Sequence, residues 1–217
     1  MPCHSIAQHH NHNAAYITQL RYCDQAGCTF LQIWQDYRLI LITTQWHANC
    51  SEPICPIAHA AAKIFTTHSN TVVVWSVHPN PTVRQDIENV LGNLPITIQQ
   101  RICLTAPLNY PSTIALLVRC YFTLSDSGCM PEAAPAFAKP VLVASNRTER
   151  QELVDVGGAH LVGTDIDTIE RHTDILLTDD IAYLRLQIDC SPFGDGKSSQ
   201  RIATMLSSAS HGFSRSH

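Results

Sequence analysis

The chain has 217 residues, of which 45% are apolar and 15% charged, and its formal net charge is −4. This length suits one sizeable domain or two small ones, and a pI near 6.3 argues against nucleic acid or another polyanion as a partner. No apolar stretch reaches the length of a membrane span, and Arg21 and Asp24 interrupt any signal-peptide pattern, so we expect a cytoplasmic protein without membrane contacts.

Cysteine and histidine are frequent, but their spacing is not that of a metal site. The nine cysteines include no C-x-x-C pair, and a zinc site usually needs closely spaced pairs with matched partners. We therefore predict no metal site and no cofactor. The cluster of His4, His9, His10 and His12 fits either adventitious metal binding or a disordered terminus, of which we favour the second.

The pattern along the chain changes near residue 38. Residues 1–37 are rich in His, Gln and Asn and lack hydrophobic periodicity, so we predict an irregular N-terminal segment. From Leu39 onward, short apolar runs typical of buried strands alternate with amphipathic stretches typical of helices. The expected strands are 39–42, 71–75, 102–104, 121–124, 141–144 and 160–162. The expected helices are 53–67, 82–91 with Gly92 as its stop, 111–119, 131–137 and 150–156, with further helices from about 165, 180 and 198.

Alternation at this spacing predicts an α/β fold, a Rossmann-like parallel sheet with helices on both faces. Residues 38–206 contain no linker that would divide them, so we predict one domain there and a flexible, Ser/His-rich tail over 207–217. A single flavodoxin-like domain predicts the same sheet, and periodicity alone does not separate the two.

The most informative stretch is 121–128, where an apolar run ends abruptly in Ser125-Asp126-Ser127-Gly128 and a helix-compatible segment follows. In open α/β sheets, ligands bind just past the carboxyl ends of such strands. Hydroxyls and backbone N–H groups at the start of a helix favour an anion. The turn therefore predicts an anion site, although many strand-to-helix turns use Ser, Asp and Gly for geometry alone.

Several motifs surround this turn in a fixed order. They are Glu52-Pro53, Val77-His78-Pro79-Asn80-Pro81 with Val83-Arg84, Pro107-Leu108-Asn109-Tyr110, Ser125-Asp126-Ser127-Gly128, Ala138-Lys139-Pro140-Val141-Leu142-Val143, Thr148-Glu149-Arg150, Leu161-Val162-Gly163-Thr164-Asp165 and Pro192-Phe193-Gly194-Asp195-Gly196. In this order they resemble the C-terminal domain of the non-hydrolysing UDP-N-acetylglucosamine 2-epimerases, over about residues 38–206.

This resemblance implies half of a glycosyltransferase-B-type fold, in which two Rossmann-like domains enclose the active site and the C-terminal one holds UDP. The family's enzymes are isomerases that supply precursors of cell-surface polysaccharides. They invert C2 of the sugar by eliminating UDP to a glycal and adding it back, which interconverts the N-acetylglucosamine and N-acetylmannosamine nucleotides. Such chemistry needs an acid or base at C2 and groups that stabilise UDP as a leaving group.

Carried onto this chain, the resemblance assigns UDP and substrate binding to His78, Ser127, Gly128, Cys129 and Glu132. Cys129 replaces the second glycine of the family's diphosphate loop. The glutamate that holds the ribose aligns with Ala133, so Glu132 beside it is the candidate to compensate. The aromatic residue over uracil aligns with Thr113. For His78, an equally good interpretation is a strand-end histidine that caps the following turn.

The catalytic positions depart further from the family pattern. Gln45 occupies the place of a catalytic histidine, and Ala48 occupies the place of a glutamate in the same motif. Neither side chain titrates, so we expect no intact catalytic residue. His47 lies two positions further on, a shift that would not put its ring in the same place. The family's N-terminal domain, with its catalytic carboxylates, has no counterpart in residues 1–38.

Three functions stay open. The chain is an epimerase-like subunit that needs a separately encoded N-terminal half, a non-catalytic module that binds UDP or a UDP-sugar, or a degenerate gene relic. We expect a protein that is truncated and inactive alone, with a UDP-sugar as its small-molecule ligand and a homodimer or the missing half as its possible partner.

Overall fold

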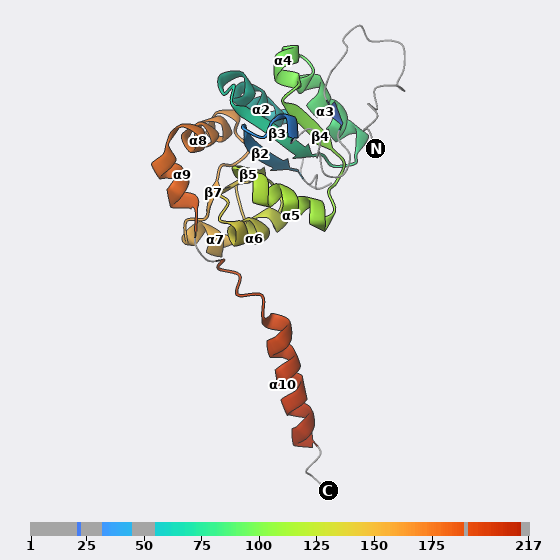
Figure 1. Cartoon of the computed structure of the whole chain (residues 1–217), viewed down its shortest axis with the longest axis vertical. Coiled ribbons are helices and arrows are strands. Elements are labelled where there is room, and N and C mark those ends of the chain that lie inside the picture. The colour runs from blue at the N-terminus through green and yellow to red at the C-terminus, as the bar shows by residue number, and fades with distance from the viewer. Residues whose placement is uncertain (1–20, 23–31, 45–54, 189–190, 214–217) are drawn as a thin grey trace.

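The computed structural model describes residues 21–22, 32–44, 55–188 and 191–213. Their centre is a seven-stranded, wholly parallel sheet with the strand order β1-β4-β3-β2-β5-β6-β7 (Figure 1). The strands are β1 (Arg21–Tyr22), β2 (Arg38–Thr43), β3 (Thr71–Ser76), β4 (Ile102–Thr105), β5 (Phe122–Ser125), β6 (Val141–Val143) and β7 (Ala159–Leu161). The predicted parallel α/β sheet is confirmed, and β1 was not predicted.

The strand order fixes where a ligand can bind. After β1, which lies at the edge beside β4, the chain enters the middle of the sheet at β2, adds β3 and β4 on one side, and then returns to place β5, β6 and β7 on the other side. Strands β2 and β5 are therefore neighbours whose following loops run in opposite directions, and such a switch point opens a crevice at the carboxyl ends of the strands. Thr43 at the end of β2 is paired in register with Ser125 at the end of β5.

Helices cover both faces of the sheet because successive strand side chains point to opposite sides. Ile40 and Ile42 of β2 pack under α2 (Cys55–Thr67), α3 (Pro81–Leu91), α8 (Ile166–Thr178) and α9 (Asp180–Leu186). Leu39 and Leu41 face α5 (Tyr110–Arg119), α6 (Cys129–Ala133) and α7 (Gln151–Asp155). Every side chain of the sheet centre is thus buried, which explains why the strands are continuous apolar runs.

Side-chain caps define where α3 and α5 begin. Asn80 and Asn109 precede α3 and α5, and their side-chain oxygens accept hydrogen bonds from backbone N–H groups of the first turn, at 2.9 Å in both cases. A proline in the first turn of each helix fits because its missing N–H has no partner there in any case. Gly92 ends α3 as predicted, although its backbone is right-handed.

Three helices differ from expectation. The short α4 (Ile96–Gln99) was not foreseen. The helix expected over 131–137 begins two residues earlier as α6 and continues as the 3-10 helix η1 (Ala134–Phe137), since Pro131 lies within the first turn, where it is tolerated. Helix α10 (Ser198–Phe213) crosses the predicted domain boundary at residue 206 and projects away from the sheet (Figure 1).

Candidate functional site

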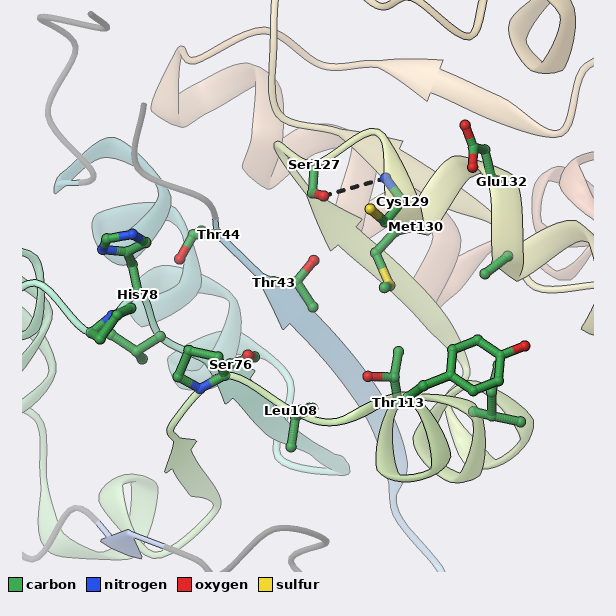
Figure 2. Close-up of a pocket in the computed structure, with 16 residues that line it drawn as sticks. Thr43, Thr44, Ser76, His78, Leu108, Thr113, Ser127, Cys129, Met130 and Glu132 are labelled. Atoms are coloured by element: carbon green, nitrogen blue, oxygen red, sulfur yellow. Dashed lines mark hydrogen bonds between the residues drawn. The ribbon is translucent and has the colours of Figure 1, made fainter. Parts of the chain in front are cut away.

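A cavity of about 820 Å³ opens at the carboxyl edge of the sheet, where the loops that follow β2 and β5 run in opposite directions. Its walls come from the ends of β2 and β3, the loop after β4, the start of α5, and the β5–α6 connection (Figure 2). The lining residues are Thr43, Thr44, Ser76, Val77, His78, Pro79, Pro107, Leu108, Tyr110, Thr113, Ile114, Ser127, Cys129, Met130, Glu132 and Ala133. A mixed wall of hydroxyls and apolar groups suits a ligand with both polar and flat apolar parts.

Hydroxyl groups hold the loop after β5 in shape. The Oγ1 of Thr43 and the Oγ of Ser125 are 2.7 Å apart across the switch point, and the Ser125 hydroxyl accepts the backbone N–H of Ser127 at 3.0 Å. The Oγ of Ser127 in turn accepts the backbone N–H of Cys129 at 3.3 Å. This chain of bonds ties the loop to the end of β2 and to the buried end of β5, so that the loop is held in shape without a ligand.

The cysteine in this loop does not distort it. Gly128 has the right-handed conformation φ −65°, ψ −19°, and Cys129 is the first residue of α6. Both conformations are open to any L-residue, so replacing a glycine by Cys129 introduces no backbone strain. A Cβ added at Gly128 would meet only the guanidinium of Arg150, at 3.7 Å, which is an ordinary contact. The Cys129 thiol is exposed.

We predict that Cys129 and Cys120 react very differently with iodoacetamide in the folded protein. Burial raises the pKa of the Cys120 thiol to about 12, whereas Cys129 is exposed, and the thiolate is the reactive form. Peptide mapping by mass spectrometry after alkylation at pH 8 should find Cys129 modified and Cys120 modified only after denaturation. Equal rates at the two positions in the native protein would contradict this placement.

Arg150 brings a positive charge to the same loop from a distant part of the chain. It lies just before α7, and its guanidinium lies within 4 Å of where a Cβ on Gly128 would be. The Nε donates to Glu132 Oε1 at 2.5 Å and Nη1 donates to Glu149 Oε2 at 3.3 Å, so these carboxylates raise the pKa of Arg150 further. Because α6 has only five residues, its dipole is small. Arg150 is the principal cation beside this loop in the described part of the chain.

His78 follows β3 on the opposite side of the cavity from Glu132 (Figure 2). Its Nδ1 accepts the backbone N–H of Asn80 at 3.2 Å. The neutral ring therefore carries its proton on Nε2, where it is a hydrogen-bond donor. The two interpretations of this residue are compatible, because one nitrogen caps the turn while the residue also lines the cavity.

The structure brings most of the predicted site residues together. His78, Ser127, Cys129 and Glu132 line one cavity, and Gly128 joins the lining residues Ser127 and Cys129, with the Arg150 guanidinium near it. Thr113 and Ala133, at the positions of the lost uracil and ribose contacts, line the same cavity. Gln45, His47 and Ala48 lie outside the described residues. Within the described lining, the titratable groups are His78, Tyr110, Cys129 and Glu132.

Sequence reasoning gave no role to two residues of this region. Tyr110 is 77% exposed, lines the cavity and precedes Thr113 by one helical turn. It therefore offers an aromatic ring near Thr113, the position that aligns with the family's aromatic residue over uracil. In the sequence, Arg150 stands out only as part of the Thr148-Glu149-Arg150 motif. Its role follows from the pairing of β5 with β6, which brings the loops after these strands together.

A family model for UDP-N-acetylglucosamine 2-epimerase matches residues 13–207. The chain belongs to this family. The UDP-N-acetylglucosamine 2-epimerase of Escherichia coli strain K12 is 35% identical over 171 residues, which cover 79% of this chain and 44% of that protein. The chain thus spans less than half the length of the curated relative it matches.

Solved structures agree with the family assignment. A UDP-GlcNAc 2-epimerase from Neisseria meningitidis, bound to UDP-GlcNAc, superposes with a TM-score of 0.75 at 30% identity, covering 84% of this chain and 48% of that one. The C-terminal domain of a group 1 glycosyl transferase from Francisella tularensis has a TM-score of 0.57 at 14% identity, covering 78% of this chain and 91% of that domain. The latter supports the fold alone, and it confirms the predicted likeness to the C-terminal half of a glycosyltransferase-B-type fold.

Within the described residues of this epimerase-family chain, no helix is long and apolar enough to cross a membrane. The same residues contain no group of three or more His, Cys, Asp or Glu side chains placed to hold a metal ion.

Proposed function

We propose that this chain is the nucleotide-binding part of a UDP-N-acetylglucosamine 2-epimerase, that it binds UDP and UDP-N-acetylglucosamine in the switch-point cavity, and that it does not epimerise the sugar alone. The observation that carries the proposal is the position of the Arg150 guanidinium, which lies 3.7 Å from where a Cβ on Gly128 would be, in a chain of this family. A cation beside this loop supports binding of the diphosphate that the resemblance expects there.

The chemistry of the cavity supports a nucleoside diphosphate as the ligand. Arg150 and the Ser127 hydroxyl are donors for phosphate oxygens, and guanidinium groups recognise phosphate through paired hydrogen bonds. Tyr110 and Leu108 present aromatic and aliphatic surface on the α5 side, where the uracil ring would pack. The Neisseria meningitidis relative was solved with UDP-GlcNAc bound, which favours the same ligand class here.

The proposed lack of turnover follows from the groups available at C2. Elimination of UDP requires removal of the C2 proton and stabilisation of the departing diphosphate. Arg150 and Ser127 can stabilise the departing diphosphate. For removal of the C2 proton, however, Gln45 and Ala48 replace titratable residues of the family motif. One domain of a two-domain cleft would also leave a glycal intermediate open to water. We propose that a separately encoded N-terminal half or a second copy of the chain would be needed to complete the cleft.

Calorimetric titration with UDP, UMP and uridine tests the binding proposal. We expect UDP to bind at least tenfold more tightly than uridine, since the diphosphate adds charge-assisted hydrogen bonds. Alkylation of Cys129 should slow in the presence of UDP, whereas alkylation of the denatured protein should not change. Equal affinity for UDP and uridine would remove the diphosphate site from the proposal.

A separate measurement addresses turnover. Proton NMR of UDP-N-acetylglucosamine incubated with the chain in deuterated buffer reports both exchange at C2 and appearance of the N-acetylmannosamine nucleotide. We expect neither with the chain alone. Exchange or epimer formation above the rate without protein would contradict the proposed inactivity and leave the binding proposal intact.

A further inference from the structure

The Glu132 carboxylate lies in the cavity wall but is directed into an ion pair. Its Oε1 accepts the Nε–H of Arg150 at 2.5 Å, and both side chains are only partly exposed, at 47% and 28%. Glu132 lies on α6 and Arg150 just before α7, so this pair links the loops that follow two neighbouring strands. The position of the guanidinium therefore depends on Glu132.

The orientation of the guanidinium leaves one group for a ligand. Of its five N–H donors, the one on Nε is taken by Glu132, and Nη1 donates to Glu149. Nη2 makes no hydrogen bond to a described residue, and it is the atom nearest to a Cβ built on Gly128, at 3.7 Å. The two N–H groups of Nη2 thus lie beside the loop that lines the cavity.

We propose that Glu132 is a positioning residue, which holds Arg150 so that Nη2 faces the diphosphate of a bound UDP, instead of contacting the ribose itself. The inference rests on the proposed function. In this role Glu132 does not substitute for the family's ribose-binding glutamate, whose position is occupied by Ala133 here. An arginine has several rotatable bonds, and fixing them before binding removes much of the entropy loss that binding would otherwise incur.

Two other roles for Glu132 predict different results. If Glu132 contacted the ribose, its removal would weaken uridine and UDP equally. If it acted chiefly as a negative charge near the diphosphate, its removal would strengthen UDP binding because like charges would no longer repel. Only a positioning role predicts a loss confined to the diphosphate-containing ligand.

The test compares Glu132→Ala and Glu132→Gln with the wild-type chain in titrations with UDP and uridine. We expect Glu132→Ala to weaken UDP roughly fivefold to tenfold and to leave uridine unchanged. Glu132→Gln keeps an oxygen that accepts the Nε–H, so it should recover most of the UDP affinity. Glu152→Ala, on the first turn of α7, removes an exposed carboxylate that makes no described side-chain contact with Arg150 and should bind UDP like the wild type.

A second readout does not depend on UDP. The Arg150 Nε–H resonance in a proton–nitrogen NMR spectrum, assigned by its loss in Arg150→Lys, should shift in Glu132→Ala and stay nearly in place in Glu132→Gln. An unmoved resonance, a parallel loss for both ligands, or tighter UDP binding by Glu132→Ala would each overturn the positioning role. If the wild type bound UDP no better than uridine while the resonance shifted, the proposed function would fail and the ion pair would stand.

Discussion

Replacing Arg101 by methionine is expected to lower the free energy of unfolding by about 3 kcal/mol. Arg101 precedes β4 and is 7% exposed. Its Nη1 donates to the carbonyls of His68 and Thr71 at 2.9 Å each, and its Nη2 donates to the carbonyl of Phe65 at 2.5 Å. These carbonyls lie at the end of α2 and the start of β3. Methionine would remove the guanidinium donors from all three, in a place that water does not reach freely, and only the His68 carbonyl would keep a side-chain donor, the Thr71 hydroxyl.

Urea unfolding followed by circular dichroism measures this effect. Arg84→Met is the matched control, because Arg84 is 51% exposed and forms an i,i+4 ion pair with Glu88 on α3. Such surface pairs contribute about 0.5 kcal/mol or less. Similar midpoints for the two variants would show that the buried hydrogen bonds of Arg101 do not stabilise the junction between α2 and β3.

The second large effect concerns ligand affinity. Replacing Arg150 by methionine should weaken UDP binding roughly 10- to 100-fold, since hydrogen bonds to charged groups contribute about 1.5–3 kcal/mol. Uridine, which carries no phosphate, should bind the variant and the wild type equally. The difference between variant and wild type should shrink as salt is raised, because ions screen the attraction between a partly exposed guanidinium and phosphate.

Arg147→Met is the control for this experiment. Arg147 lies in the same loop, its side chain is exposed, and no hydrogen bond from its side chain to another described residue is present. We expect its UDP affinity to stay within about twofold of the wild type, given that exposed charges at this range are well screened. A loss of equal size in both variants would point to the general charge of the loop and against a specific contact by Arg150.

The order of strands and helices could be predicted because burial on both sides of a parallel sheet leaves continuous apolar runs such as 71–75. β1 has only two residues, and α4 is a single turn, so neither produces a pattern long enough to recognise. Helix boundaries were predicted well where a cap such as Asn80 precedes a proline, and less well at α6, whose first turn contains the proline.

The candidate site was predictable only in part, because its residues are brought together by strand pairing. His78 and Ser127 were identified from motifs within single loops. Arg150 is 22 positions after Gly128 and reaches it only because β6 lies beside β5. Glu132 was assigned to the right region with a different role, since sequence does not reveal that its carboxylate is bonded to a neighbouring loop.

The hydrogen bond between Thr43 and Ser125 also bears on how the protein folds. Its two residues are 82 positions apart, so the floor of the cavity forms only after β3, β4 and α5 have been placed and a long loop has been closed. Partly folded forms that lack the pairing of β2 with β5 contain no binding site. A nucleotide that binds there would therefore oppose global unfolding and have little influence on local fraying of α9 or α10.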